Sequence, residues 1–347
     1  MLVVVIGAGY AGTMAANRLV RKADVEVTVI NPRPEFVERV RLHEYIAGSG
    51  AATVPLTDML DPKITLVVGS ADLIDNGSVL LDDGTTLAFD YLVYAAGGSI
   101  DEPEGTVAVG SLASAERARA ELAALDDDAV VTVVGGGLTG VETAAEIAEA
   151  RPTLRVRLLS ESEIAASLSS RARARVHQEL GRLGVTLHRG RYVAKQDTAD
   201  LTLWAVANQV SDLARRSGLA VDSHGRLLVD EFLRSVSDAK IIAVGDGAAV
   251  PGQRPSCQTA LPQGAHGADN LIRELTGKKQ KRYSMGYIGQ NVSIGRRQGV
   301  IQTSRRDDTP TWLWFGGRPA ARYKEQVCRM ACGAAKSAQY VWLPAPR

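Results

Sequence analysis

The chain has 347 residues, of which 45% are hydrophobic and 23% charged, a composition that excludes a disordered protein. Its length predicts about two domains, each with enough residues to bury a hydrophobic core. Forty Lys and Arg against 39 Asp and Glu give a net charge of +1, which argues against a dedicated nucleic-acid-binding protein.

The N-terminal segment predicts one βαβ unit. The run Leu2–Ile6 is short, β-branched and apolar on both faces, as expected of a strand buried in a parallel sheet. The glycine-rich turn GAGYAG at residues 7–12 follows, then a helix over residues 13–21 and a second strand over residues 25–30. A strand, a turn, a helix and a further strand form the repeating unit of parallel sheets.

The same pattern returns near residue 130. A strand at Val130–Val134 leads into GGGLTG at residues 135–140, then a helix that ends near Ala150, then a strand over residues 154–159. Between the two units we expect a loop-rich stretch at 32–57, short strands at 66–68 and 79–81, a turn at Asp83-Gly84, a strand at Tyr91–Tyr94 and a helix at 114–125.

The rest of the chain is less regular. We expect helices at 171–183, 261–275 and 320–336, and strands at 185–188, 240–244, 287–294 and 300–303. The order of elements indicates a first domain, an inserted second domain, a return to the first domain and a small C-terminal cap. The expected boundaries are 1–110, 111–235, 236–276 and 277–347.

Both glycine-rich turns have the spacing of a dinucleotide-binding turn. In Gly-x-Gly-x-x-Gly the first glycine allows the tight turn, the second lets the backbone approach a pyrophosphate, and the third lets the helix pack against the strand. The helix N-terminus adds free N–H groups and a partial positive charge. The residues expected to bind the two nucleotides are Gly7, Ala8, Gly9, Tyr10, Ala11 and Gly12 in the first turn, and Gly135, Gly137, Leu138, Thr139 and Gly140 in the second.

Neither unit has the acidic residue that usually binds ribose at the end of its second strand. The first unit has Asn31 there, followed by Pro32 and Arg33, and an asparagine amide can still bind a ribose hydroxyl. The second unit has Ser160 followed by Glu161. If Glu161 reaches the ribose, NADH is favoured; if it points away, Ser160 tolerates a 2′-phosphate. The choice between NADH and NADPH stays open.

The two turns, the strand end Ala95-Ala96-Gly97 and the segment Val244-Gly245-Asp246 together resemble the FAD-dependent pyridine-nucleotide oxidoreductases. The resemblance covers about residues 1–325. It implies an α/β fold of two Rossmann-like dinucleotide-binding domains with a small α+β C-terminal cap. FAD would bind the first turn and NAD(P)H the inserted domain. Asp246 would hydrogen-bond the ribityl chain of the flavin.

Within that family the chain resembles the type II NADH dehydrogenases and the quinone reductases similar to apoptosis-inducing factor. The segment VVGGGLTGVETAAEIAE matches that branch, and the resemblance gives Glu142 a role in orienting the nicotinamide. From the residues alone, Glu142 is equally a solvated residue of the first helical turn. The helix start CQTALPQG at residues 257–264 matches the segment that covers the flavin, which places Gln263 near the electron acceptor. The resemblance adds Arg41, Ala71, Ala95, Ala96, Gly97, Gly245, Asp246, Gln258, Thr259 and Ala260 to the residues expected to bind FAD.

Three positions depart from the pattern of this branch. Cys257 replaces an alanine, Pro262 replaces the first glutamine of a pair, and Ala205-Val206-Ala207 stands where a glycine-containing segment is expected. The pattern favours an FAD-dependent NAD(P)H dehydrogenase that reduces a quinone or another small acceptor. The alternative is an FAD- or nucleotide-binding sensor or partner protein with little turnover. Hydride transfer needs no protein nucleophile, because the cofactors carry the chemistry.

The cysteines and histidines exclude other classes. A disulfide reductase of this family needs a redox cysteine pair after the first βαβ unit, and residues 34–60 contain no cysteine. Cys257, Cys328 and Cys332 form no disulfide framework, which predicts a cytoplasmic protein, and we expect them to pack as small apolar residues. A regulatory thiol pair at Cys328 and Cys332 is the alternative. No metal is expected, because the histidines lack ligand spacing. Neither a signal peptide nor a membrane-spanning helix is expected.

The neutral total hides an uneven distribution of charge. Residues 273–347 contain fifteen Lys and Arg against four Asp and Glu, a net charge of +11, which leaves −10 for the residues before them. Trp312, Trp314, Phe315 and Trp342 accompany this positive charge. Two interpretations are equally favoured: a peripheral contact with the inner face of an anionic membrane, or a cap docked on the chain's own acidic domains or on a partner in a homodimer.

Overall fold

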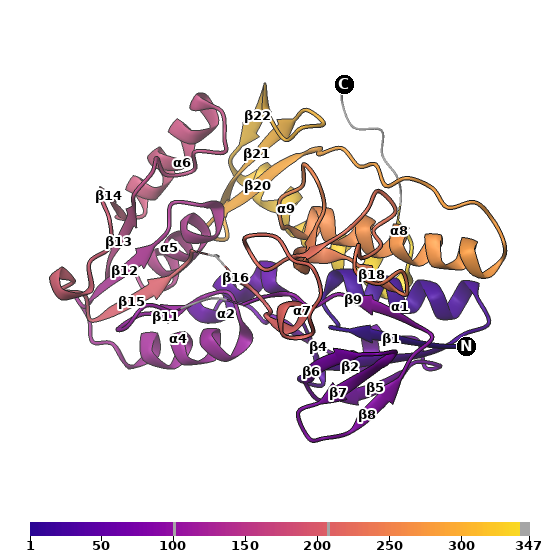
Figure 1. Ribbon diagram of the computed structural model, residues 1–347. Helices are drawn as coiled ribbons and strands as arrows, with labels where there is room; N and C mark the ends of the chain where they lie inside the picture. Colours follow the sequence, from indigo (N-terminus) through magenta and orange to yellow (C-terminus); the bar gives the residue numbers. More distant parts are fainter. Residues whose placement is uncertain (100–101, 207–208, 341–347) are drawn as a thin grey trace.

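The computed structural model describes residues 1–99, 102–206 and 209–340 (Figure 1). Two five-stranded parallel sheets hold the two predicted βαβ units, and a three-stranded antiparallel sheet lies near the C-terminus. Figure 1 shows the two parallel sheets on opposite sides of the molecule, with the C-terminal sheet and helix above and between them. The α/β fold class predicted from the sequence is confirmed.

The first parallel sheet has the strand order β18-β9-β1-β2-β5. Its strands and helices are β1 (Leu2–Ile6), α1 (Tyr10–Lys22), β2 (Glu26–Asn31), β5 (Thr65–Val68), β9 (Tyr91–Tyr94), β18 (Ile241–Ala243) and α8 (Cys257–Leu275). Val3 and Val4 point to opposite faces of β1 and both are buried, as expected for a central parallel strand. Helices α1 and α8 approach closely because Gly264 has no side chain; a Cβ there would overlap the carbonyl oxygen of Ala11.

The second parallel sheet has the strand order β11-β15-β12-β13-β14. Its elements are β11 (Val107–Ala108), α4 (Leu112–Ala124), β12 (Val130–Val134), α5 (Leu138–Ala150), β13 (Arg155–Ser160), α6 (Ser170–Arg182), β14 (Thr186–Arg189) and β15 (Leu201–Trp204). The order places β12 at the centre of the sheet, so the second glycine-rich turn follows the central strand. Ligands of open parallel sheets bind at the carboxyl ends of such strands.

The C-terminal segment connects the two parallel sheets. It consists of β20 (Gly289–Ile294), β21 (Gln298–Ser304), β22 (Pro310–Gly316) and α9 (Arg318–Ser337). Val292 and Ile294 of β20 belong to the hydrophobic core of the second sheet. Ala331 and Ala335 of α9 belong to the core of the first sheet. Because its apolar residues are divided between two cores, this segment holds the two sheets in a fixed relation.

The stretch predicted to be loop-rich, residues 32–57, contains regular structure, and that prediction is wrong in part. It holds β3 (Glu35–Val37), α2 (Leu42–Ala47) and β4 (Thr53–Pro55), and α3 (Leu56–Met59) begins at its end. Helix α2 is too short to show a periodic pattern in the sequence, although Leu42 and Ile46 are buried. The other short elements are β6 (Ala71–Asp75), β7 (Ser78–Leu81), β8 (Thr86–Ala88), β10 (Gly98–Ser99), β16 (Gln209–Val210), α7 (Leu213–Arg216), β17 (Leu227–Leu228) and β19 (Ala248–Ala249).

Several helices begin earlier than predicted. Helix α1 begins at Tyr10, inside the glycine-rich turn, and α8 begins at Cys257, directly after the capping residue Ser256. Glycines and small polar residues at a helix start carry no apolar period, so the pattern shows only the later turns. The division into domains at residues 110, 235 and 276 stays a prediction. Across the part of the chain that the structure describes, no helix has both the length and the apolar character needed to cross a membrane.

Candidate functional site

The outer glycines of both glycine-rich turns are closely packed against backbone. A Cβ on Gly7 would lie 2.6 Å from the carbonyl oxygen of Ala95, and one on Gly12 would overlap the carbonyl oxygen of Gly7. Likewise, a Cβ on Gly140 would overlap the carbonyl oxygen of Gly135. Gly7 and Gly135 also have positive φ angles of 95° and 125°. The first and third positions of both turns therefore require glycine for steric reasons.

The middle glycine of each turn faces open space. Among the described residues, no atom lies within 4 Å of the position that a Cβ would take on Gly9 or Gly137. These glycines precede α1 and α5, and no described side chain caps either helix. The N–H groups at both helix N-termini are therefore available to a ligand, and a pyrophosphate satisfies such groups. Each turn fits one dinucleotide.

Asn31 and Ser160 occupy equivalent positions at the ends of β2 and β13. Asn31 Oδ1 accepts a hydrogen bond from the backbone N–H of Ala8 at 3.0 Å. Ser160 lies against Gly136, where a Cβ would be 2.7 Å from the Ser160 Cβ. Each side chain thus touches the residue after the first glycine of its turn, which is where the ribose-binding residue stands in dinucleotide-binding units. The neighbouring Glu161 side chain is 71% exposed.

A third backbone turn, Gly245-Asp246-Gly247, follows β18 at the same edge of the first sheet. Gln263 holds it in place, because its Oε1 accepts from the N–H of Gly245 at 2.7 Å and its Nε2 donates to Gln253 Oε1 at 2.9 Å. Gln263 is only 3% exposed. Its observed role is to position this turn, and its contact with an acceptor stays a prediction. The Asp246 carboxylate is partly exposed and lies 3.4 Å from Arg39 Nη1.

The remaining residues predicted to bind FAD lie mostly at strand ends of the first sheet. Pro32 and Arg33 follow β2, Ala71 begins β6, Ala95, Ala96 and Gly97 follow β9, and Thr259 and Ala260 lie in the first turn of α8. Gln258 connects α8 to the C-terminal sheet, with its amide oriented to donate to Gly289 O at 3.1 Å and to accept from Ile288 N at 3.0 Å. Their contacts with FAD stay predictions.

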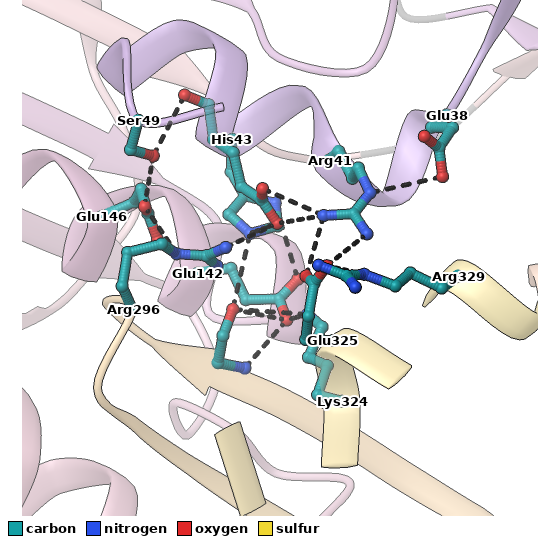
Figure 2. A network of polar contacts seen from close by, with 12 residues as sticks. Glu38, Arg41, His43, Ser49, Glu142, Glu146, Arg296, Lys324, Glu325 and Arg329 are labelled. Carbon is teal, nitrogen blue, oxygen red and sulfur yellow. Dashed lines mark hydrogen bonds and ion pairs between the residues drawn. The ribbon is translucent and has the colours of Figure 1, made fainter. Parts of the chain in front are cut away.

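A buried polar cluster lies where α2, α5, β20 and α9 meet (Figure 2). Its members are Arg41, His43, Glu44, Glu142, Glu146, Ser293, Arg296, Lys324 and Glu325. Glu142, two residues after the second turn, forms an ion pair with Lys324 and accepts from the N–H of Ser293 at 3.1 Å. The side chains of Glu142 and Lys324 are only 11% and 7% exposed. Glu142 is therefore not a solvated residue; its contact with nicotinamide stays a prediction.

The cluster changes the proton affinity of its members. Burial lowers the pKa of Lys324 to about 8. Burial, assisted by Lys324 and two arginines, lowers the pKa of His43 well below its usual range, so His43 is neutral at pH 7. His43 Nε2 lies 3.4 Å from Ser293 Oγ, and His43 Nδ1 lies 4.0 Å from Glu142 Oε2. A proton can therefore be held or released at Lys324 Nζ close to neutral pH.

Two arginines connect the carboxylates around this pair. Arg41 donates to both carboxylate oxygens of Glu325 at 2.9 and 3.0 Å and to Glu44 at 3.2 Å. Arg296 lies 2.9 Å from an oxygen of Glu44. It also lies 2.9 Å from an oxygen of Glu146 (Figure 2). Arg41 was expected to bind FAD; the structure places it in an ion-pair network that connects α2 to α9, and its contact with FAD stays a prediction.

Lys324, His43 and Arg296 are not among the site residues predicted from the sequence. One signal was available for Lys324. The buried residues of α9 are Ala320, Lys324, Cys328, Ala331 and Ala335, at helical spacing. A lysine in an otherwise small and apolar stripe marks a buried cation. No sequence pattern distinguishes His43 or Arg296 from surface residues, because their partners come from distant segments.

The cysteines are free. Cys332 Sγ lies 3.8 Å from Met59 Sδ, and Cys328 is buried in the same stripe of α9. Among the described residues, no group of His, Cys, Asp and Glu could hold a metal ion. Ala207 and Trp342, which figure in the predictions from the sequence, lie outside the described residues.

Two dinucleotide turns, each on its own parallel sheet, define a protein class that binds two dinucleotides. The profile of the pyridine nucleotide-disulphide oxidoreductases matches residues 1–264. An NADH dehydrogenase-like protein of Mycobacterium tuberculosis is 30% identical over 324 residues, covering 79% of this chain and 80% of that protein. The type II NADH:quinone oxidoreductase NdhA of the same organism is 24% identical, covering 90% and 81%. The solved sulfide:quinone oxidoreductase of Aquifex aeolicus has a TM-score of 0.82 at 16% identity, covering 97% and 92%.

The chain therefore belongs to the pyridine nucleotide-disulphide oxidoreductase family. Membership confirms the resemblance read from the motifs and identifies an NAD(P)H-dependent enzyme, with FAD implied as its cofactor. The open turns at Gly9 and Gly137 fit these two groups sterically and electrostatically.

Proposed function

We propose that this protein oxidises NAD(P)H at the inserted domain, passes the electrons through FAD at the first domain, and reduces a quinone-type acceptor. The observation that carries the proposal is the pair of open glycine turns, each at the carboxyl ends of its own parallel sheet. The relative named as an NADH:quinone oxidoreductase supports the acceptor class. FAD, when bound, supplies the exchange of electrons between nicotinamide and acceptor.

The chain's own residues bind and orient the two nucleotides. The N–H groups at the start of α1, beside Gly9, hold the pyrophosphate of FAD, and those at the start of α5, beside Gly137, hold that of NAD(P)H. Asp246 follows the first sheet's strand β18 and offers a partly exposed carboxylate to the flavin side chain. Gln263 keeps the backbone of this turn in place.

The Glu142–Lys324 pair handles a proton. Reduction of a quinone to a quinol takes up two electrons and two protons, whereas NAD(P)H supplies two electrons and one proton. The second proton must come from the protein or from solvent. Lys324 fits this task because its pKa is lowered to about 8 and because it lines a cavity of about 410 Å³ together with Ser293 and Arg296.

Anaerobic mixing with NADH and with NADPH tests the hydride step, and we expect the flavin absorbance near 450 nm to bleach with at least one of them. No bleaching with either nucleotide within minutes would refute the proposal in favour of the alternative, a sensor with little turnover. The reduced protein is then mixed with a soluble quinone. We expect rapid reoxidation in the wild type. In folded, FAD-loaded Lys324→Met we expect reoxidation to slow by a larger factor than flavin reduction does.

We further propose a peripheral membrane contact through the cap surface, formed by Trp312, Leu313 and Phe315 of β22 and Tyr323 of α9. Trp312 is 83% exposed, and the other three are 41–48% exposed. Arg318 and Arg322 flank these residues and are also exposed. Trp314 is half-buried against the core of the second sheet and does not contribute. Exposed aromatic residues beside cations suit an anionic lipid surface.

Sedimentation with phosphatidylglycerol vesicles tests this contact. We expect binding at low salt that is lost at high salt, and no binding to neutral phosphatidylcholine vesicles. Failure to bind anionic vesicles at low salt would refute the membrane contact. The homodimer predicted as an alternative partner would then be tested by the mass of the protein in solution.

A further inference from the structure

The residue at the end of β13, Ser160, influences whether the inserted domain binds NADH or NADPH. Ser160 stands where a carboxylate usually binds the two ribose hydroxyls, because it lies against Gly136 of the second turn. A carboxylate in this position repels a 2′-phosphate, whereas a hydroxyl can donate to it. Ser160 is only 5% exposed in the free chain, so the turn itself holds it in place.

Two arginines lie at the end of the neighbouring strand: Arg189 is its last residue, and Arg191 lies in the loop that follows. Strand β14 runs parallel to β13, with Arg189 opposite Ser160. The N–H of Gly190 donates to the carbonyl oxygen of Ser160 at 2.9 Å, which fixes the start of the following loop beside the ribose position. Arg189 and Arg191 on either side of this glycine are both exposed. Arg189 forms no ion pair with any described residue.

The acidic residues nearby are already paired. Glu161 lies 3.7 Å from Arg191, with both side chains in solvent. Glu163 lies 2.9 Å from Arg173 on α6. The open alternative from the sequence was that Glu161 either reaches the ribose or points away. In the structure Glu161 lies beside Arg191 with its side chain 71% exposed, whereas Ser160 lies against Gly136 of the turn.

We propose that Ser160, Arg189 and Arg191 form a subsite for the 2′-phosphate of NADPH, and that the enzyme prefers NADPH to NADH. The inference rests on the proposed function, because it assigns the ribose of NAD(P)H to the second turn. A phosphate dianion pairs with both guanidinium groups, which are suited to phosphate because they present several donors in a plane. Binding of the phosphate releases Arg191 from Glu161.

The test uses the purified FAD-containing protein and nucleotides that cannot reduce it. Calorimetric titrations compare NADP⁺ with NAD⁺, and adenosine 2′,5′-bisphosphate with 5′-AMP, since each pair differs only in the 2′-phosphate. We expect the phosphorylated member to bind at least tenfold more tightly in both pairs. The double variant Arg189→Ala/Arg191→Ala should weaken NADP⁺ at least tenfold and NAD⁺ less than twofold. Arg182→Ala, an exposed arginine elsewhere on this domain, should change neither.

A second variant tests the subsite without changing either arginine. Glu161→Gln removes the competing carboxylate, so we expect NADP⁺ to bind more tightly and NAD⁺ to be unaffected. Equal affinities of the wild type for NADP⁺ and NAD⁺, or equal weakening of both in the double variant, would overturn the subsite. This failure is distinct from failure of the proposed function. If NADP⁺ binds preferentially but neither NADPH nor NADH bleaches the flavin, the subsite stands and the proposed turnover does not.

Discussion

Replacement of Lys324 by methionine tests the buried pair that connects the inserted domain to the C-terminal helix. The substitution preserves most of the side-chain volume and removes the charge. Among the described residues, the Glu142 carboxylate, whose side chain is 11% exposed, then keeps the N–H and hydroxyl of Ser293 at 3.1 and 3.4 Å and the neutral His43 at 4.0 Å. Removal of one partner from a buried pair costs about 3–5 kcal/mol, mostly because the other charge stays buried without compensation.

A double-mutant cycle separates the energy of the Glu142–Lys324 ion pair from the effect of lost packing. Glu142→Leu/Lys324→Met replaces both charges by apolar groups, and such replacements cost little compared with breaking the pair. We therefore expect the double variant to be more stable than Lys324→Met alone, with a coupling energy of about 2 kcal/mol or more. The free energy of unfolding is measured by urea titration with saturating FAD, since bound cofactor contributes to stability.

Two results would refute this reasoning. One is a cost below about 1 kcal/mol for Lys324→Met, within the range of exposed pairs. The other is a double variant whose loss equals the sum of the two single losses, because residues in direct contact do not behave additively. As a control, Lys336→Met replaces an exposed lysine of the same helix and should leave stability nearly unchanged.

Three further predictions follow from the same structure. Gly9→Val should yield a colourless protein that does not retain FAD, whereas Gly137→Val should retain FAD but resist reduction by NAD(P)H, both measured by flavin absorbance. Both variants should fold, because each position has room for a side chain. Arg41 lowers the pKa of Glu325 to about 2, so stability from this carboxylate is present above about pH 4.5 and is lost as the pH falls toward 2; Glu325→Gln should flatten that part of the acid-unfolding profile. Trp312→Ala should reduce sedimentation with anionic vesicles severalfold while leaving flavin reduction unchanged. An equal loss of sedimentation in folded Trp314→Ala, which replaces a half-buried residue outside the cap surface, would contradict the assignment of lipid contact to that surface.

The parallel sheets and their turns could be predicted because the responsible signals are local. A run such as Leu2–Ile6 can be buried on both faces only as a central strand, and the spacing of Gly7, Gly9 and Gly12 reflects contacts within a single turn. Helix α2 escaped prediction because six residues contain too few turns to show a period. Its burial depends on packing against α4 and α5, which no local pattern records.

The polar cluster could not be predicted for a related reason. Arg41, Glu142 and Lys324 come from three chain segments more than 100 residues apart. The apolar stripe of α9 marks Lys324 as buried, but no local pattern identifies its partners. Only the packing of α9 across both sheets brings them together. Gln263 has a role that its motif does not predict. Its Oε1 accepts from the N–H of Gly245 and its Nε2 donates to Gln253, while its contact with an acceptor stays a prediction.

The basic residues of the C-terminal segment fall into two groups in the structure. Part of the basic C-terminal segment neutralises acidic residues of the body, since Arg296 pairs with Glu44 and Glu146 and Lys324 pairs with Glu142. Arg318 and Arg322, by contrast, are exposed beside the cap surface and form no ion pair with any described residue. The net charge of +11 is therefore larger than the positive charge that is exposed to a membrane surface. Arg296 and Lys324 dock the segment on the acidic domains, whereas Arg318 and Arg322 are the cations proposed to contact lipid. The two interpretations of the basic segment are therefore compatible, and substitution of one pair of cations tests one role without removing the other.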